Sequence, residues 1–153
     1  MYKNTKLNSM QSDYLKYWRV VRYFIKAKYG LTTGELDMLL FLNSEKYFDK
    51  DKFTGFNQLL GWNKNRFEKL KKEGWIEVFR KGHRGRKSIY CLSYKTKRVI
   101  KSIYNKLEGE EIPTSPSSNP MFLKNVCYND KVYRNMIIEM NEFIKQQRHH
   151  SEK

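Results

Sequence analysis

Apolar residues recur at helical spacing in several stretches of the chain, and glycines and polar turns separate these stretches. In residues 13–29 they stand three and four positions apart, and Gly30 then ends the predicted helix. Thr32 and Glu35 have the spacing of a capping box, so a second helix is expected to begin there. Its buried side is expected to consist of Leu36, Leu39, Leu40 and Phe41.

Two short helices separated by a glycine turn are expected next. Residues 47–53 are polar with two aromatics, which indicates a connection or a short turn of helix. Thr54 is the expected cap of a helix over 55–60, which Gly61 ends, and Asn63 is the expected cap of a helix over 64–73. Two short helices across a tight glycine-containing turn are the signature of a helix-turn-helix.

A β-hairpin with a basic tip follows these helices. Residues 75–79 and 88–92 are rich in strand-forming residues, and the glycine-bearing segment KGHRGRK lies between them. Residues 94–107 are again helical in pattern. The expected buried side of this helix is Val99, Ile100, Ile103, Tyr104 and Leu107.

The chain is expected to divide into four segments. Residues 1–12 form a flexible N-terminus, and 13–108 form a winged helix-turn-helix domain with its leading helix. Residues 109–120 contain all three prolines, which predicts an extended linker that does not pack. Residues 121–153 form a C-terminal dimerisation helix and tail, with the helix over about 130–147.

The charge of the chain is strongly positive. There are 31 Lys+Arg against 16 Asp+Glu, a formal net charge of +15 at pH 7. An excess of this size opposes folding through self-repulsion and points to a polyanionic partner. A lysine-rich composition from AT-rich coding is the plainer explanation of the same numbers.

The order of elements and several motifs resemble the MarR-type winged-helix transcription regulators. The motifs are LTTGELDMLLFL, FNQLLGWNKNRFEKLKKEGWIEVFR, KGHRGRK and SIYCLSYKTKRVI. The resemblance implies a mainly α fold with a small β-hairpin wing (α+β), flanked by N- and C-terminal dimerisation helices. It also implies a homodimer that binds double-stranded DNA, and a phage or plasmid version of the family fits equally well.

The helix over 64–73 is the expected recognition helix. With Phe67 and Leu70 facing inward, helical geometry turns Asn65, Glu68, Lys69 and Lys72 outward. Arg and Asn can bridge the major-groove edges of guanine and adenine, and lysines can meet phosphates. An ordinary lysine-rich surface helix would have a similar composition. The predicted DNA-binding residues of this helix are Lys64, Asn65, Arg66, Lys69 and Lys72.

The hairpin tip is the second expected DNA contact. Six cationic side chains within eight positions repel one another unless an anion lies near. A narrow minor groove and its flanking phosphates favour such side chains, although a mobile basic loop is the alternative. The predicted residues are Arg80, Lys81, His83, Arg84, Arg86 and Lys87.

The first and last helices have wide apolar faces, which indicate either a partner subunit or well-buried helices. The predicted dimer interface is Tyr14, Trp18, Val21, Ile25, Tyr133, Met136, Ile137, Met140, Phe143 and Ile144.

No catalytic motif is recognised, so we expect a protein that is not an enzyme and needs no cofactor or metal. With reduced cysteines and no signal peptide, a cytoplasmic protein is expected, in the host cytoplasm if viral. The preferred function is sequence-specific transcription regulation, with a possible transcription-machinery partner and no membrane contact. The alternatives are a replication-initiation, packaging or architectural DNA-binding factor of a mobile element, or a winged-helix module that docks on an acidic protein.

Overall fold

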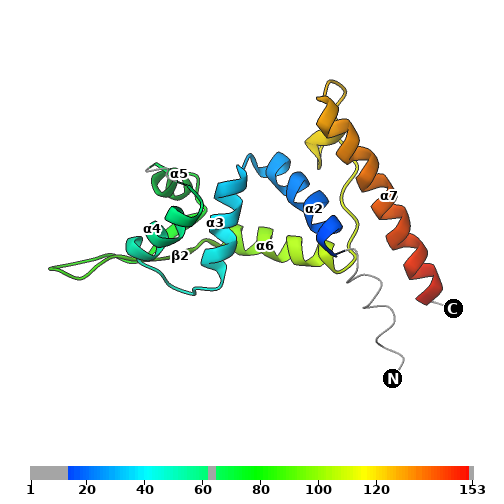
Figure 1. Cartoon of the computed structure of the whole chain (residues 1–153). Helices are drawn as coiled ribbons and strands as arrows, with labels where there is room; N and C mark the ends of the chain where they lie inside the picture. Colours follow the sequence, from blue (N-terminus) through cyan, green and yellow to red (C-terminus); the bar gives the residue numbers. More distant parts are fainter. Residues whose placement is uncertain (1–13, 62–64, 152–153) are drawn as a thin grey trace. The chain divides into compact units, whose positions relative to one another are not determined.

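The computed structural model describes residues 14–61 and 65–151 and shows a mainly helical chain with one β-hairpin (Figure 1). This is the predicted α+β winged-helix class. In chain order the elements are α2 (Tyr14–Tyr29), α3 (Thr33–Asn43), α4 (Lys50–Leu59), α5 (Arg66–Lys72), β1 (Ile76–Arg80), β2 (Ile89–Leu92), α6 (Tyr94–Leu107), the 3-10 turn η1 (Pro120–Phe122) and α7 (Tyr128–Ser151).

The chain forms two compact units. One is Leu31–Lys101, which contains the helix-turn-helix and the hairpin, and the other holds the described residues before and after it. The division differs from the predicted domain over 13–108, because α2 and the end of α6 belong with the C-terminal helix. We call these the winged-helix unit and the α2–α7 unit.

Helix α3 begins where the sequence predicts. The Thr32 hydroxyl accepts a hydrogen bond from the Glu35 backbone N–H at 3.2 Å, which satisfies one free donor of the first turn. Leu36 and Leu39 are buried as expected. The burial expected for Phe41 is wrong: its side chain is 42% exposed and contacts the ring of Phe56, 5.5 Å between centroids.

Helix α4 starts earlier than predicted. Asp49 caps it by accepting a hydrogen bond from the Lys52 N–H at 2.9 Å, so Thr54 lies inside the helix. The Thr54 hydroxyl donates to the Lys50 carbonyl instead. The sequence does not predict this start, because the lysine-rich segment before Thr54 shows no apolar periodicity.

The sheet of the winged-helix unit is small and antiparallel. Ile76 pairs with Leu92 and Val78 with Tyr90, and an irregularity between Val78 and Arg80 shifts the register toward the tip. Phe48, predicted to lie in a connection, forms a bridge with Tyr90 through two backbone hydrogen bonds of 2.8 and 3.0 Å. This isolated bridge ties the segment before α4 to β2.

Helix α6 occupies the predicted residues, and four of the five side chains expected on its buried face are buried. Tyr104 is the exception, with 52% of its surface exposed. In the winged-helix unit, Thr96 near the start of α6 donates a 2.6 Å hydrogen bond to the Trp75 carbonyl. This bond connects the first turn of α6, which follows β2, to the residue that precedes β1.

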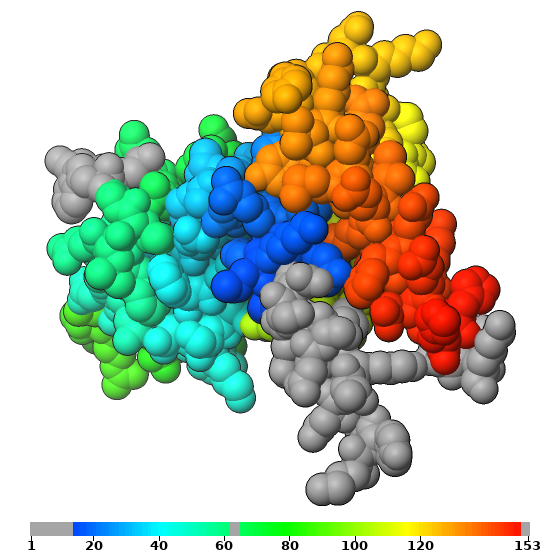
Figure 2. All heavy atoms as spheres, turned by 45° about the vertical axis from the view of Figure 1, so that its right-hand side comes forward, coloured from blue at the N-terminus to red at the C-terminus, as the bar shows by residue number. Residues whose placement is uncertain are grey.

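In the α2–α7 unit, α2 packs against α7, and the two helices adjoin at the molecular surface (Figure 2). Tyr23 and Tyr133 stack with 3.9 Å between ring centroids. The Arg19 Nε donates to the Tyr133 hydroxyl at 3.2 Å. Val21 of α2 and Ile137 of α7 are both completely buried.

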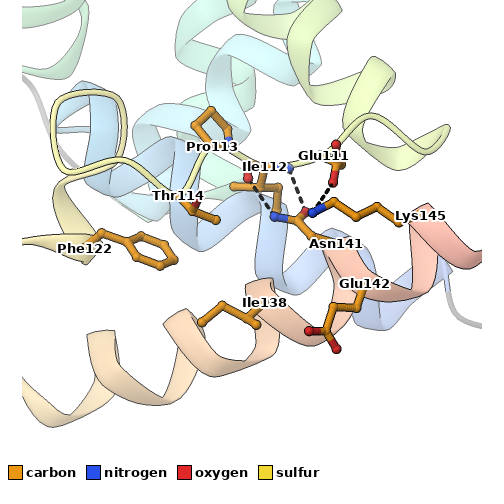
Figure 3. Close-up of a pocket in the computed structure, with 9 residues that line it drawn as sticks. All are labelled: Glu111, Ile112, Pro113, Thr114, Phe122, Ile138, Asn141, Glu142 and Lys145. Atoms are coloured by element: carbon orange, nitrogen blue, oxygen red, sulfur yellow. Dashed lines mark hydrogen bonds and ion pairs between the residues drawn. The ribbon is translucent and has the colours of Figure 1, made fainter.

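The segment predicted as an unpacked linker is in fact tied to α7. The side chain of Asn141 donates to the Ile112 carbonyl at 2.9 Å and accepts from the Ile112 N–H at 3.0 Å (Figure 3). Ile112 and Asn119 are buried. An extended segment leaves its backbone groups open, and an amide side chain can satisfy a donor and an acceptor of the same residue. Beside this contact lies a pocket of about 630 Å³ that Asn141, Phe122 and Ile138 help to line.

Candidate nucleic-acid interface

The hairpin tip is a tight turn that depends on glycine. Arg84 and Gly85 have φ values of +47° and +82°, and the Arg86 N–H donates to the His83 carbonyl at 3.1 Å. At Gly82 a Cβ atom would lie 2.4 Å from the Arg86 carbonyl oxygen. The two arms of the tip can therefore approach this closely only because residue 82 has no side chain.

The basic residues of the tip gather around one hollow. A pocket of about 410 Å³ is lined by Arg80, Lys81, His83, Arg84 and Arg86, and no carboxylate lies among its lining residues. All five side chains are exposed, and the hairpin extends away from α3, α4 and α5 (Figure 1). The structure thus brings together five of the six residues predicted for the wing. We call these five residues the basic tip.

Lys87, the sixth predicted wing residue, is directed elsewhere. Its ammonium forms an ion pair with the carboxylate of Asp51 in α4, and the hydrogen bond to Asp51 raises the pKa of Lys87. Both side chains are largely exposed, so water screens this pair and its contribution is small.

Helix α5 presents some of its predicted residues to solvent. Phe67 and Leu70 are buried, as predicted, and Asn65, Glu68 and Lys72 are exposed. Positions 65, 68 and 72 lie on one side of a helix because they are three and four residues apart. The predicted contact at Lys64 and the predicted cap Asn63 lie outside the described residues.

Arg66 does not point outward with them. Its guanidinium donates a 2.7 Å hydrogen bond to the Asn57 side-chain oxygen in α4, and Asn57 is buried. A Cβ at Gly34 would lie 2.8 Å from a guanidinium nitrogen of Arg66, so glycine leaves room for the arginine. The base-reading role predicted for Arg66 stays a prediction, and it would require this internal hydrogen bond to break.

Lys69 is also engaged within the protein. Its ammonium donates to the carboxylate of Glu35 at 2.6 Å. The hydrogen bond and charge of Glu35 raise the pKa of Lys69. Glu35 is buried and Lys69 is half exposed. The phosphate contact predicted for Lys69 therefore competes with this ion pair, which the sequence does not reveal because the spacing of Thr32 and Glu35 indicates only a capping box.

Half of the ten predicted dimer-interface residues lie within the chain's own core. Val21, Ile25, Ile137, Met140 and Ile144 are at most 5% exposed, whereas Tyr14 is 41% exposed. The remaining predicted residues, Trp18, Tyr133, Met136 and Phe143, are partly exposed. The well-buried-helix reading of these apolar faces accounts for the first group, and a partner could contact only the second.

The two cysteines have different surroundings. Cys91 on β2 is buried, and burial, followed by the nearby carboxylate of Glu77, raises the pKa of its thiol. Cys127, just before α7, is exposed. Over residues 14–61 and 65–151, no three His, Cys, Asp or Glu side chains come together as a metal site would require.

No protein-family model matches the chain, and no curated protein matches it. A solved structure described as "Structure of Disulfide formed AbfR" is similar to it with 16% sequence identity and a TM-score of 0.44. The similarity covers 96% of this chain and 92% of that chain. Across the described part of the chain, no helix is long and apolar enough to span a membrane. The winged-helix assignment therefore rests on the elements of this chain and their order.

Proposed function

We propose that this protein binds double-stranded DNA through the basic tip and the exposed side of α5, and regulates transcription without catalysing a reaction. The observation that carries the proposal is the basic tip itself. Three arginines and a lysine line one hollow together with His83 on a projecting hairpin, and no carboxylate lies among them. Holding these charges together costs repulsion, which a polyanion removes.

The shape of the hairpin suits a groove of the duplex. The turn at Arg84 and Gly85 is narrow, and the missing side chain of Gly82 lets the two arms of the tip lie close together. Arginine side chains on a slender arm can enter a narrow minor groove, where the electrostatic potential is most negative. The neighbouring lysine can contact the flanking phosphates.

The exposed side of α5 supplies chemistry for base contacts. Asn65 can bridge the N6 and N7 atoms of adenine, and the Glu68 carboxylate can accept from the amino group of cytosine. Lys72 is exposed at the other end of the helix and can meet a phosphate. In the winged-helix class the recognition helix enters the major groove, so these side chains would face base edges.

A homodimer is the form we propose for sequence-specific binding, in keeping with the MarR-type resemblance. The half-exposed residues of α2 and α7, Tyr14 among them, are the candidate contacts between two copies. Two recognition helices would then read half-sites about one helical turn apart. Sedimentation at micromolar concentration tests this directly, and a monomer that binds asymmetric sites would refute it.

Selection of bound fragments from a random duplex library at about 0.15 M salt tests the proposal as a whole, because exposed charges are already screened at that ionic strength. A two-fold-symmetric motif supports a dimeric regulator. Recovery without a motif would indicate an architectural or replication factor. Failure to recover any duplex would refute DNA binding and favour an acidic protein partner.

A further inference from the structure

The Glu35 carboxylate is an acidic group in an unusual place. It lies in the first turn of α3, where the helix dipole favours negative charge, and it is only 4% exposed. Its Oε1 accepts the 2.6 Å hydrogen bond from Lys69, and across the described residues its Oε2 has no hydrogen-bond partner. Lys69 therefore supplies the compensating positive charge.

We propose that Glu35 is a positioning residue. It holds the Lys69 side chain so that this lysine ties α5 to α3, and it keeps the charge of Lys69 out of the interface with DNA. The inference rests on the proposed function. A buried carboxylate that loses its cation is left with an uncompensated charge, which is costly in a low-dielectric setting. A phosphate on the duplex surface is surrounded by water and counterions, so it offers Lys69 no comparable compensation.

A lysine ammonium has three donors, and Lys69 is half exposed, so one N–H could still point toward a phosphate. Binding of this kind adds little affinity, because Glu35 already neutralises the lysine charge. Release of counterions from DNA scales with the net positive charge brought to the phosphates. The Glu35–Lys69 ion pair has no net charge, so it is expected to release no counterions.

Arg66 provides a second anchor one turn before Lys69. It reaches α4 through Asn57, whereas Lys69 reaches α3 through Glu35. Two long side chains tied to two different helices fix the rotation of α5 about its own axis. In this orientation Asn65, Glu68 and Lys72 are exposed.

The salt dependence of DNA binding tests the proposal, since log K falls with log salt by about 0.9 for each phosphate contact. The variants are Glu35→Gln and Lys69→Met, with Lys72→Met as the matched control, and the probe is a random-sequence duplex. We expect Lys72→Met to flatten the slope by about 0.9 and Lys69→Met to leave it unchanged. Glu35→Gln frees the charge of Lys69 and should steepen the slope by about 0.9.

The proposal is overturned if Lys69→Met flattens the slope as much as Lys72→Met does, or if Glu35→Gln leaves the slope unchanged. Glu35→Gln leaves no uncompensated charge in the interior, so this variant is expected to fold. It therefore still tests the proposal if Lys69→Met fails to fold.

A second readout needs no DNA. Glu35→Gln, Lys69→Met and the double variant are compared by thermal unfolding. We expect the double variant to lose less Tm than the sum of the single losses, because each single change removes the same interaction. Additive losses would overturn the pairing. If the wild-type protein binds no duplex, the proposed function fails, and this comparison still decides whether Glu35 holds Lys69.

Discussion

Replacing Asn141 with leucine should destabilise the α2–α7 unit through two backbone groups of a single residue. Asn141 is 7% exposed and Ile112 1% exposed, and the amide of Asn141 pairs with both the N–H and the carbonyl of Ile112. Leucine has almost the shape of asparagine but can neither donate nor accept. The variant therefore leaves a buried donor and a buried acceptor without their partner.

The expected magnitude follows from these two groups. Each buried polar group left unsatisfied costs about 1–3 kcal/mol, so the pair costs about 2–6 kcal/mol. For a protein of this size, each kcal/mol lowers Tm by about 2–4 °C, so a loss of at least about 4 °C is expected. Asn141 also lines the adjoining pocket. If water enters from this pocket and hydrogen-bonds to the Ile112 backbone, the loss of stability is expected at the lower end of this range.

Thermal unfolding followed by far-ultraviolet circular dichroism measures this loss. Glu142→Leu is the matched control, because it is the neighbouring residue of α7 and its side chain is exposed. We expect the control to stay close to the wild type. A Tm for Asn141→Leu within about 1 °C of the control would refute the assignment of Asn141 as the residue that fastens the 109–120 segment, given the 2–4 °C expected per kcal/mol.

Three further predictions concern the tip and the cysteines. Arg84→Ala combined with Arg86→Ala should flatten the salt slope of duplex binding by about 1.8, at about 0.9 for each lost phosphate contact; an unchanged slope would remove the basic tip from the interface. Gly82→Ala should weaken duplex binding, because the new Cβ would lie 2.4 Å from a backbone oxygen of the tip. Thermal unfolding of the same variant should change little, and binding equal to wild type would show that the tip tolerates the side chain. Alkylation at pH 8, read by mass spectrometry of peptides, should modify Cys127 much faster than Cys91, because burial raises the pKa of Cys91 and leaves less reactive thiolate. Equal rates would contradict the burial of Cys91.

Much of the local structure could be predicted from the sequence because it depends on neighbouring residues. The Thr32 cap, the glycine that ends α2 and the strand-rich segments on either side of KGHRGRK act within a few positions of one another. The concentration of cations at the tip is equally local, since a hairpin necessarily brings residues 80–86 together. These features led to both the fold class and the basic tip.

The partners of long polar side chains could not be predicted in the same way. Helical spacing placed Lys69 on the outer side of α5, and the residue is exposed. A lysine side chain is long and flexible enough to turn back, and the buried carboxylate that attracts it is 34 positions away in the sequence. Arg66 turns inward for the same reason, because the oxygen of Asn57 lies on another helix.

In the 109–120 segment, the partners of the backbone groups were equally impossible to predict from the sequence. Prolines and serines excluded regular structure there, and that expectation was correct apart from η1, which begins at Pro120. Composition cannot reveal that a distant asparagine satisfies the open backbone groups and buries Ile112. By itself, then, the sequence determined the elements, their order and the basic tip, all of which follow from short-range periodicity, capping and turn chemistry. Only the tertiary structure decided which cations pair with oxygens of the chain itself, because that depends on which oxygens the packed helices bring within reach of each side chain.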